Sequence, residues 1–179
     1  YYYLSIRSVN QIKETYSNNK TESSSNSYYY GGWCMNTQCT DWNPVGGNTV
    51  CAGNFSDLSK APPDLSKTTI ANRWMTLGGQ DVQGTLPSTD TIVGWAKQYN
   101  YNGVDFDMEG SLSGKENEVN ELMAELKKNG LHTQATVMGS SGFSTAATWT
   151  NADTIALMLY GNSMNGAGWD IPSGVTAEN

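Results

Sequence analysis

Three acidic residues alternate with apolar residues in one short segment of the chain. Asp105, Asp107 and Glu109 occupy every second position of GVDFDME, and valine, phenylalanine and methionine stand between and before them. In a β-strand, residues two positions apart point to the same face. The pattern therefore predicts a strand with three carboxyl groups on one face and an apolar opposite face.

Such a cluster is costly to bury, because each unpaired charge costs on the order of several kcal/mol. Crowded carboxylates also push one another's pKa values apart, so that one of them can stay protonated near neutral pH. A general acid needs this property. We therefore favour an acid–base catalytic site. A divalent metal site and a merely hydrophilic barrel lining are the alternatives.

The segments around this one follow a regular alternating pattern from residue 28 onward. Short apolar or aromatic runs alternate with longer stretches, some of which have helical spacing. Parallel strands need crossovers of this kind, so the pattern predicts an α/β fold with a parallel sheet. The runs cover residues 28–33, 49–55, 72–79, 101–109, 131–138 and 154–160.

Two of the crossovers have clear helical patterns. Residues 88–100 begin with Ser88 as the expected N-cap, and residues 116–130 end at Gly130 after two lysines. The apolar faces predicted for these helices consist of Ile92, Trp95, Ala96 and Tyr99, and of Val119, Leu122, Met123 and Leu126.

Several common chemistries lack their motifs in this chain. The first βα turn carries no G-x-G-x-x-G, and no Walker A sequence occurs, which argues against nucleotide binding. No G-x-S-x-G is present, and no Ser or Cys nucleophile motif lies near His132, the only histidine, so we expect a structural role for it. One histidine also argues against a zinc site. An open doubly wound sheet and a closed eight-stranded barrel both remain compatible with the alternating pattern.

Three motifs resemble those of one enzyme family. GVDFDME resembles the D-x-x-D-x-D-x-E signature of glycoside hydrolase family 18, the chitinases and chitinase-like lectins. WMTLGG (74–79) resembles the third-strand S-x-G-G of that family, with Thr76 where serine is usual. MLY (158–160) resembles its sixth-strand Met-x-Tyr. The resemblance covers roughly residues 28–162, and the fourth-strand motif is its most specific part.

The resemblance implies a (β/α)8 TIM barrel with its site at the C-terminal ends of the strands. Only about six strands can be identified, whereas such barrels usually need about 250 residues. We therefore expect an incomplete barrel in a partial chain, with an N-terminal extension or linker at 1–27 and the barrel domain at 28–179. The chain also departs from the family pattern at Asn102, where aspartate is usual, and at Gly161, where aspartate or asparagine is usual.

The resemblance further implies a substrate-assisted, retaining mechanism without metal or organic cofactor. Glu109 would protonate the leaving glycosidic oxygen and later activate water. Asp107 would orient the acetamido group of the substrate and stabilise positive charge, and Asp105 would share a proton with Asp107. Tyr160 would donate a hydrogen bond to the acetamido oxygen.

The expected substrate is a β-1,4-linked N-acetylglucosamine polymer such as chitin. Trp33 lies near a strand end, where a sugar ring could stack on it, with ordinary packing as the alternative. The remaining substrate-binding candidates are Gly78, Gly79, Met158 and Asn162. A non-catalytic glycan-binding or structural protein is the alternative function, and an endo-glycosidase on N-linked glycans or peptidoglycan would use the same chemistry.

The composition of the chain restricts the kinds of partner that it is expected to bind. The net charge is −7 and the ten lysines and arginines are scattered, so we expect no nucleic-acid partner. No apolar run approaches the roughly 20 residues that span a bilayer. The chain begins without an initiator methionine or a signal-peptide pattern, so we expect a processed or partial polypeptide.

The cysteines and two sequons indicate the compartment. Cys34 and Cys39 flank a short turn and could form a local disulfide, whereas Cys51 lies in an apolar stretch; free thiols throughout are the alternative. Asn19 and Asn54 begin Asn-x-Ser/Thr sequons. We expect a secreted or lumenal, disulfide-bonded glycoprotein.

Overall fold

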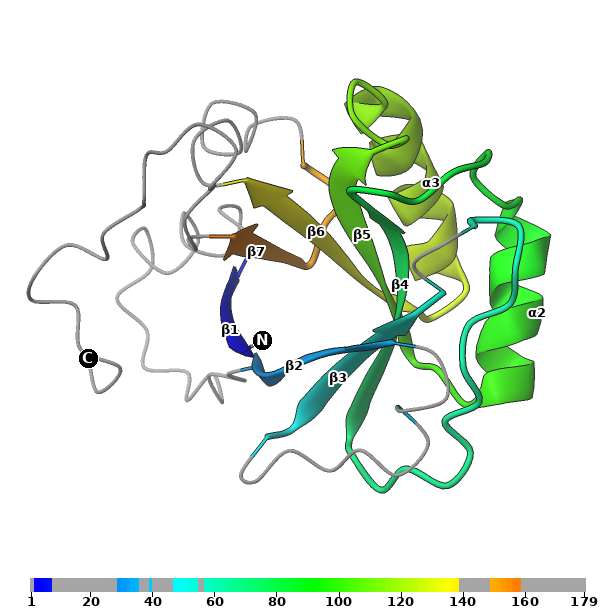
Figure 1. Cartoon of the computed structure of the whole chain (residues 1–179), viewed down its shortest axis with the longest axis vertical. Helices are drawn as coiled ribbons and strands as arrows, with labels where there is room; N and C mark the ends of the chain where they lie inside the picture. Colours follow the sequence, from blue (N-terminus) through cyan, green and yellow to red (C-terminus); the bar gives the residue numbers. More distant parts are fainter. Residues whose placement is uncertain are drawn as a thin grey trace, which may run out of the picture.

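A computed structural model of the chain describes residues 2–7, 29–35, 39, 47–54, 57–138 and 149–158. Six consecutive strands of this part lie parallel to one another and form a curled sheet (Figure 1). They confirm the six strands predicted from the sequence. Their bounds are β2 Tyr29–Met35, β3 Thr49–Gly53, β4 Asn72–Gly79, β5 Gly103–Gly110, β6 His132–Met138 and β7 Thr154–Met158.

A further strand joins the two edges of this sheet. Strand β1, Tyr2–Arg7, pairs antiparallel with β2 on one side and with β7 on the other, so that the seven strands close into a barrel (Figure 1). This strand lies within residues 1–27, for which the sequence predicts an extension or linker. Closure through β1 leaves neither β2 nor β7 as an open edge.

The structure describes two helices, both on the outside of the sheet (Figure 1). Helix α2, Thr89–Tyr99, begins where predicted, because the Ser88 hydroxyl accepts a hydrogen bond from the Thr91 amide at 3.2 Å. Helix α3, Glu116–Lys128, ends with two lysines in its last turn. The described residues 57–71, between β3 and β4, contain no helix.

Apolar side chains gather in two separate places. One cluster fills the space between the sheet and the helices and includes Val104 and Phe106 of β5, Ile92 of α2 and Met123 of α3. The apolar faces predicted for both helices are thereby confirmed, since each helix buries part of its predicted face in this cluster. Strand β5 therefore uses every second side chain to hold the helices.

The second cluster lies on the other face of the strands, inside the curled sheet. Cys51, Trp74 and Ala156 are buried there, with Tyr29 and Trp33 packed against them. Side chains of alternate strand positions fill the interior of small barrels in this way. The same face of β5 carries Asp105, Asp107 and Glu109, so the acidic residues are set against a filled interior.

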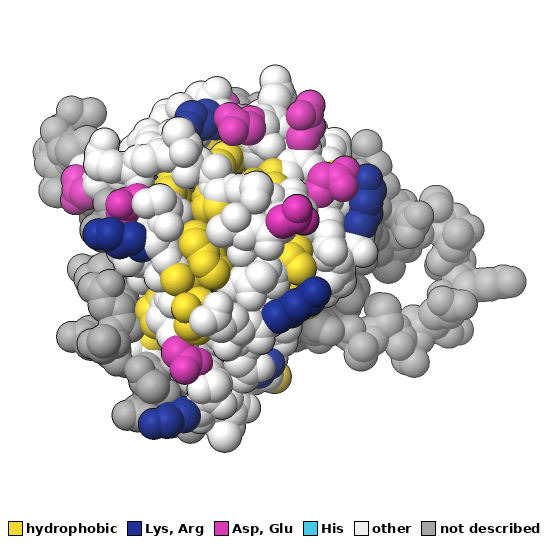
Figure 2. Space-filling model, turned by 90° about the vertical axis from the view of Figure 1, so that its right-hand side faces the viewer, with side chains coloured by type: hydrophobic (Ala, Val, Ile, Leu, Met, Phe, Trp, Pro, Cys, Tyr) yellow, Lys and Arg dark blue, Asp and Glu magenta, His cyan; other side chains and the backbone are white. Residues whose placement is uncertain are grey.

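Figure 2 shows the face that carries the two helices. Hydrophobic side chains lie exposed there between acidic and basic side chains, which are distributed singly and in both signs. None of the described helices is both long enough and apolar enough to cross a membrane.

Candidate active site

Strand β5 positions two of the three carboxyl groups inside the curled sheet. The Asp105 side chain is 0 % exposed and that of Asp107 is 8 % exposed. Their neighbours Val104 and Phe106 face the helices instead. The alternation in GVDFDME thus separates a carboxyl face from an apolar face, as the sequence predicts.

A bulge in the β4–β5 pairing lies next to the third carboxyl group. The register passes from Gly78 opposite Asp107 directly to Gly79 opposite Gly110, which leaves Met108 and Glu109 outside the regular ladder. Bulges of this kind re-aim side chains beside active sites. Glu109 is half-buried, near the C-terminal end of the strand.

The two glycines of β4 make this geometry possible. Gly78 and Gly79 have φ angles of 108° and 119°, which side-chain-bearing residues rarely adopt. A Cβ atom on Gly78 would lie 2.1 Å from the carbonyl oxygen of Asp107. Both glycines therefore have a backbone role beside the acidic residues, and their contact with a substrate remains a prediction.

Four hydrogen bonds hold the carboxylate of Asp105. Its Oδ2 accepts from the Trp33 indole Nε1 at 2.8 Å and from the Thr76 hydroxyl at 3.0 Å. Its Oδ1 accepts from Gln134 Nε2 at 3.1 Å and from the Thr136 hydroxyl at 2.5 Å. Burial raises the pKa of Asp105 above its ordinary value, and these hydrogen bonds offset only part of that rise.

Two of these partners, Gln134 and Thr136, were missed by the sequence reasoning. Both are fully buried and lie on β6, the neighbour of β5. The signal was present, because HTQATVM places a polar residue at every second position of a buried strand. Their shared face with His132 is the barrel interior.

Asp107 lies in a different environment, although it is only two residues from Asp105. Its Oδ1 is buried and has no hydrogen-bond partner among the described residues. Burial first, and then the negative charges of Asp105 and Glu109, raise the pKa of Asp107 to about 8. A pKa near 8 favours the protonated form of Asp107 at neutral pH. Within the described residues no hydrogen bond joins it to Asp105, and the shared proton remains a prediction.

Glu109 is half-buried and therefore more accessible than Asp105 and Asp107. Burial, and then the charge of Asp81, raise the pKa of Glu109 above its ordinary value. A raised carboxyl pKa keeps the acid form available closer to neutral pH. The trio thus combines a buried carboxyl group held by four hydrogen bonds, a buried carboxyl group with a raised pKa and a half-buried carboxyl group.

The other predicted site residues are only partly described. Trp33 is half-buried against the interior cluster, and Met158, at the end of β7, is 4 % exposed. Asn54 directly follows β3, at the same end of the sheet as Glu109. Tyr160, Asn162 and Asn19 lie outside the described residues.

Asn102, at the position where the D-x-x-D-x-D-x-E pattern has its first aspartate, lies before β5 and outside the carboxyl cluster. Its Oδ1 accepts a hydrogen bond from the Arg73 amide at 2.8 Å, and its Nδ2 donates to the Ala71 carbonyl at 2.7 Å. An ionised aspartate could accept the first of these bonds but could not donate the second. Asparagine at this position therefore anchors the start of β5 to the start of β4.

The predicted disulfide is present. Cys34 at the end of β2 is bonded to Cys39, with their Cα atoms 5.4 Å apart. Cys51 is buried in the barrel interior and is not disulfide-bonded. Across the described residues, no group of three or more His, Cys, Asp and Glu side chains is arranged to hold a metal ion.

Comparisons of the chain with protein-family models, with curated proteins and with solved structures found no match.

Proposed function

We propose that this chain is a glycoside hydrolase that cleaves β-1,4-linked N-acetylglucosamine polymers through a substrate-assisted, retaining mechanism, on a TIM-barrel type of fold. One observation carries the proposal. Asp105 and Asp107 point into a parallel, barrel-like sheet, and Glu109 follows them at the C-terminal end of the same strand. Active sites of parallel barrels lie at this end.

The first step uses the proton of Glu109. Glu109 transfers it to the glycosidic oxygen while the bond from that oxygen to the anomeric carbon breaks. The carbonyl oxygen of the substrate's own 2-acetamido group attacks the anomeric carbon and forms an oxazolinium ion. Water then attacks this carbon from the side that the leaving group vacated and gives a proton to Glu109, so that the configuration is retained.

Asp107 and Asp105 support this reaction without forming a bond to the sugar. The buried Oδ1 of Asp107, unpartnered among the described residues, is an acceptor suited to the acetamido N–H. Positive charge on the oxazolinium ring favours the ionised form of a neighbouring carboxyl group. Asp105, held by four hydrogen bonds, keeps a fixed orientation two residues before Asp107 on the same strand.

The test compares the parent chain with Glu109→Gln on a chitin oligosaccharide, with products read by mass spectrometry. We expect hydrolysis by the parent and a loss of roughly 100-fold or more in the variant, with glycan binding retained. Glu121→Gln, a neutralisation of an exposed glutamate on α3, is the matched control and should leave hydrolysis unchanged.

The outcomes separate the two functions. Equal hydrolysis by the parent and Glu109→Gln would contradict the mechanism. Binding without hydrolysis in either chain would favour the alternative, a non-catalytic glycan-binding protein.

A further inference from the structure

A row of hydrogen bonds crosses the barrel interior from the start of β6 to Asp105. His132 Nε2 lies 3.0 Å from the Thr154 hydroxyl oxygen. This hydroxyl donates to Gln134 Oε1 at 3.1 Å, and Gln134 Nε2 donates to Asp105 Oδ1 at 3.1 Å. Thr154, Gln134 and Asp105 are each 0 % exposed, so water does not compete for these bonds.

The orientation of the Gln134 amide decides whether it stabilises Asp105. With Nε2 toward Asp105 the amide donates to a buried carboxylate, but with Oε1 in that place two acceptors would face each other. A donor on the far side, facing Oε1, favours the same orientation of the amide and fixes it from the other end. Thr154 supplies that donor, provided that its single hydroxyl proton is not used elsewhere.

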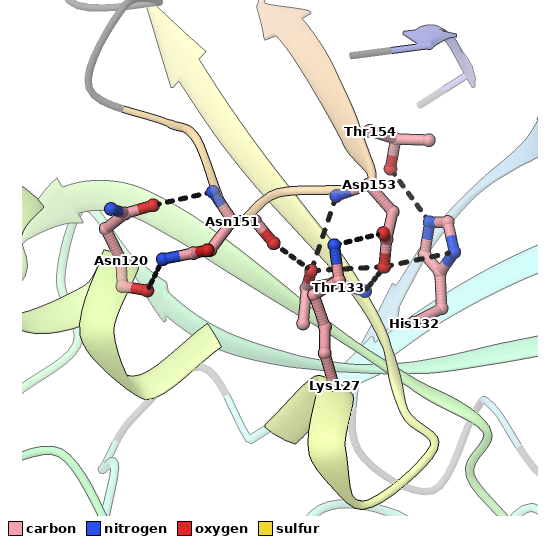
Figure 3. A network of polar contacts seen from close by, with 7 residues as sticks. All are labelled: Asn120, Lys127, His132, Thr133, Asn151, Asp153 and Thr154. Atoms are coloured by element: carbon pink, nitrogen blue, oxygen red, sulfur yellow. Dashed lines mark hydrogen bonds and ion pairs between the residues drawn. The ribbon is translucent and has the colours of Figure 1, made fainter. Parts of the chain in front are cut away.

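The tautomer of His132 controls that proton (Figure 3). If Nε2 of the neutral ring carries the hydrogen, it donates to Thr154, and the Thr154 proton is available to Gln134. If Nδ1 carries it, Nε2 accepts the Thr154 proton and Gln134 Oε1 loses its donor. Nδ1 lies 3.8 Å from Asp153 Oδ2, too far for a hydrogen bond, so the Nε2 tautomer satisfies more groups.

The surroundings of His132 keep its ring neutral and in place. The ring stacks on Trp74, with centroids 4.4 Å apart and planes at 11°. Burial lowers the pKa of His132 to about 4; the Asp153 carboxylate acts against this and Lys127 acts with it. Asp153 itself is ion-paired with Lys127 at 2.6 Å (Figure 3).

We infer that Thr154 and His132 are positioning residues that act through Gln134 to hold Asp105 in the geometry the reaction needs, a role that rests on the proposed function. The row of hydrogen bonds fixes the position of Asp105 and does not conduct protons. Gln134 donates through Nε2 and accepts through Oε1, and an amide cannot pass a proton between these two atoms without leaving its stable form.

The first test reads the tautomer and needs no activity. His132 is the only histidine, so ¹⁵N-histidine labelling yields a single imidazole for NMR. We expect the neutral ring at pH 7 to carry its hydrogen on Nε2. A hydrogen on Nδ1 would overturn the inference, whether or not the chain hydrolyses chitin.

The second test removes the hydroxyl. Thr154→Val is expected to lower kcat about tenfold with little change in KM, and Thr154→Ser should restore it. Thr133→Val is the matched control, because Thr133 is equally buried but bonds to Asn151 and Asp153 outside the row. In the same variants, the Gln134 side-chain amide signals should change with Thr154→Val and stay unchanged with Thr133→Val.

These readouts distinguish the two hypotheses. A parent without hydrolysis but with the expected tautomer and Gln134 response would contradict the proposed function and leave the hydrogen-bond row established. Hydrolysis that responds equally to Thr154→Val and Thr133→Val would contradict the positioning role alone. If Thr154→Val does not fold, the NMR measurement of the His132 tautomer and the kinetics of Thr154→Ser still test the positioning role.

Discussion

The indole Nε1 of Trp33 donates a hydrogen bond of 2.8 Å to Asp105, although the two residues are 72 positions apart in the chain. Trp33 lies on β2 and Asp105 on β5, with two strands between them. Only a curled sheet brings these side chains together. For Trp33 the sequence left sugar stacking and ordinary packing open, and the structure adds a third role, the stabilisation of a buried carboxylate.

Trp33→Phe tests this role. The substitution keeps an aromatic ring but removes one donor from a fully buried acceptor, so we expect a loss of about 1–3 kcal/mol in the free energy of unfolding. Chemical denaturation measures it. Trp95→Phe, a similar truncation on α2, is the control. Equal losses in both variants would show that only ring size matters.

Gly78 and Gly94 differ in what a methyl group would meet. Gly78→Ala places a Cβ atom 2.1 Å from the Asp107 carbonyl oxygen at a φ of 108°. We expect it to destabilise the fold by about 2 kcal/mol or more and to lower activity, because the bulge beside Glu109 must shift.

Gly94→Ala is the matched control in α2, where nothing lies within 4 Å of the added atom. There we expect a gain of about 0.5–1 kcal/mol from helix propensity. Thermal or denaturant unfolding of both variants checks the pair, and a stabilising Gly78→Ala would contradict the described β4–β5 geometry.

The raised pKa of Asp107 predicts a pH-dependent stability. Its value is about 8 in the fold and near 3.8 when unperturbed, so between these values the folded state holds a proton that the unfolded state lacks. The free energy of unfolding therefore falls as pH rises toward 8, because the unfolded state gives up this proton and the folded state does not. Between about pH 6.5 and 8, where an unfolded histidine is mostly neutral, the parent should lose stability that Asp107→Asn retains.

Denaturant titrations at several pH values measure this difference. Asp64→Asn is the control, because hydrogen bonds from Ser66 lower the pKa of Asp64 and place its titration below this window. A parent and an Asp107→Asn variant with the same pH slope would contradict a protonated Asp107.

Local patterns predicted much of this fold. The alternation in GVDFDME indicates a strand with a carboxyl face, and Ser88 with the apolar spacing after it indicates a helix beginning at Thr89. Each of these signals lies within about a dozen residues, the range over which backbone periodicity acts. The six parallel strands follow from the alternation of such signals with crossovers long enough to reverse the chain twice.

Tertiary structure decided which side chains surround the carboxyl groups. Thr76, Gln134 and Thr136 reach Asp105 from 29 to 31 residues away, and their contact depends on strand order and register. A shift of one residue in either pairing would turn the partner to the other face of the sheet. Likewise, β1 completes the barrel through pairings with β2 and β7 that no local pattern specifies.

The sequence by itself determined that carboxyl groups would share one face of an apolar strand. It did not determine that Asp105 would be held by four hydrogen bonds while Asp107, two residues on, would have a buried oxygen with no partner in the described part of the chain. The two residues have the same chemistry and the same local pattern. Their difference arises because the free energy of a buried charge depends on the donors around it, and distant strands supply those donors.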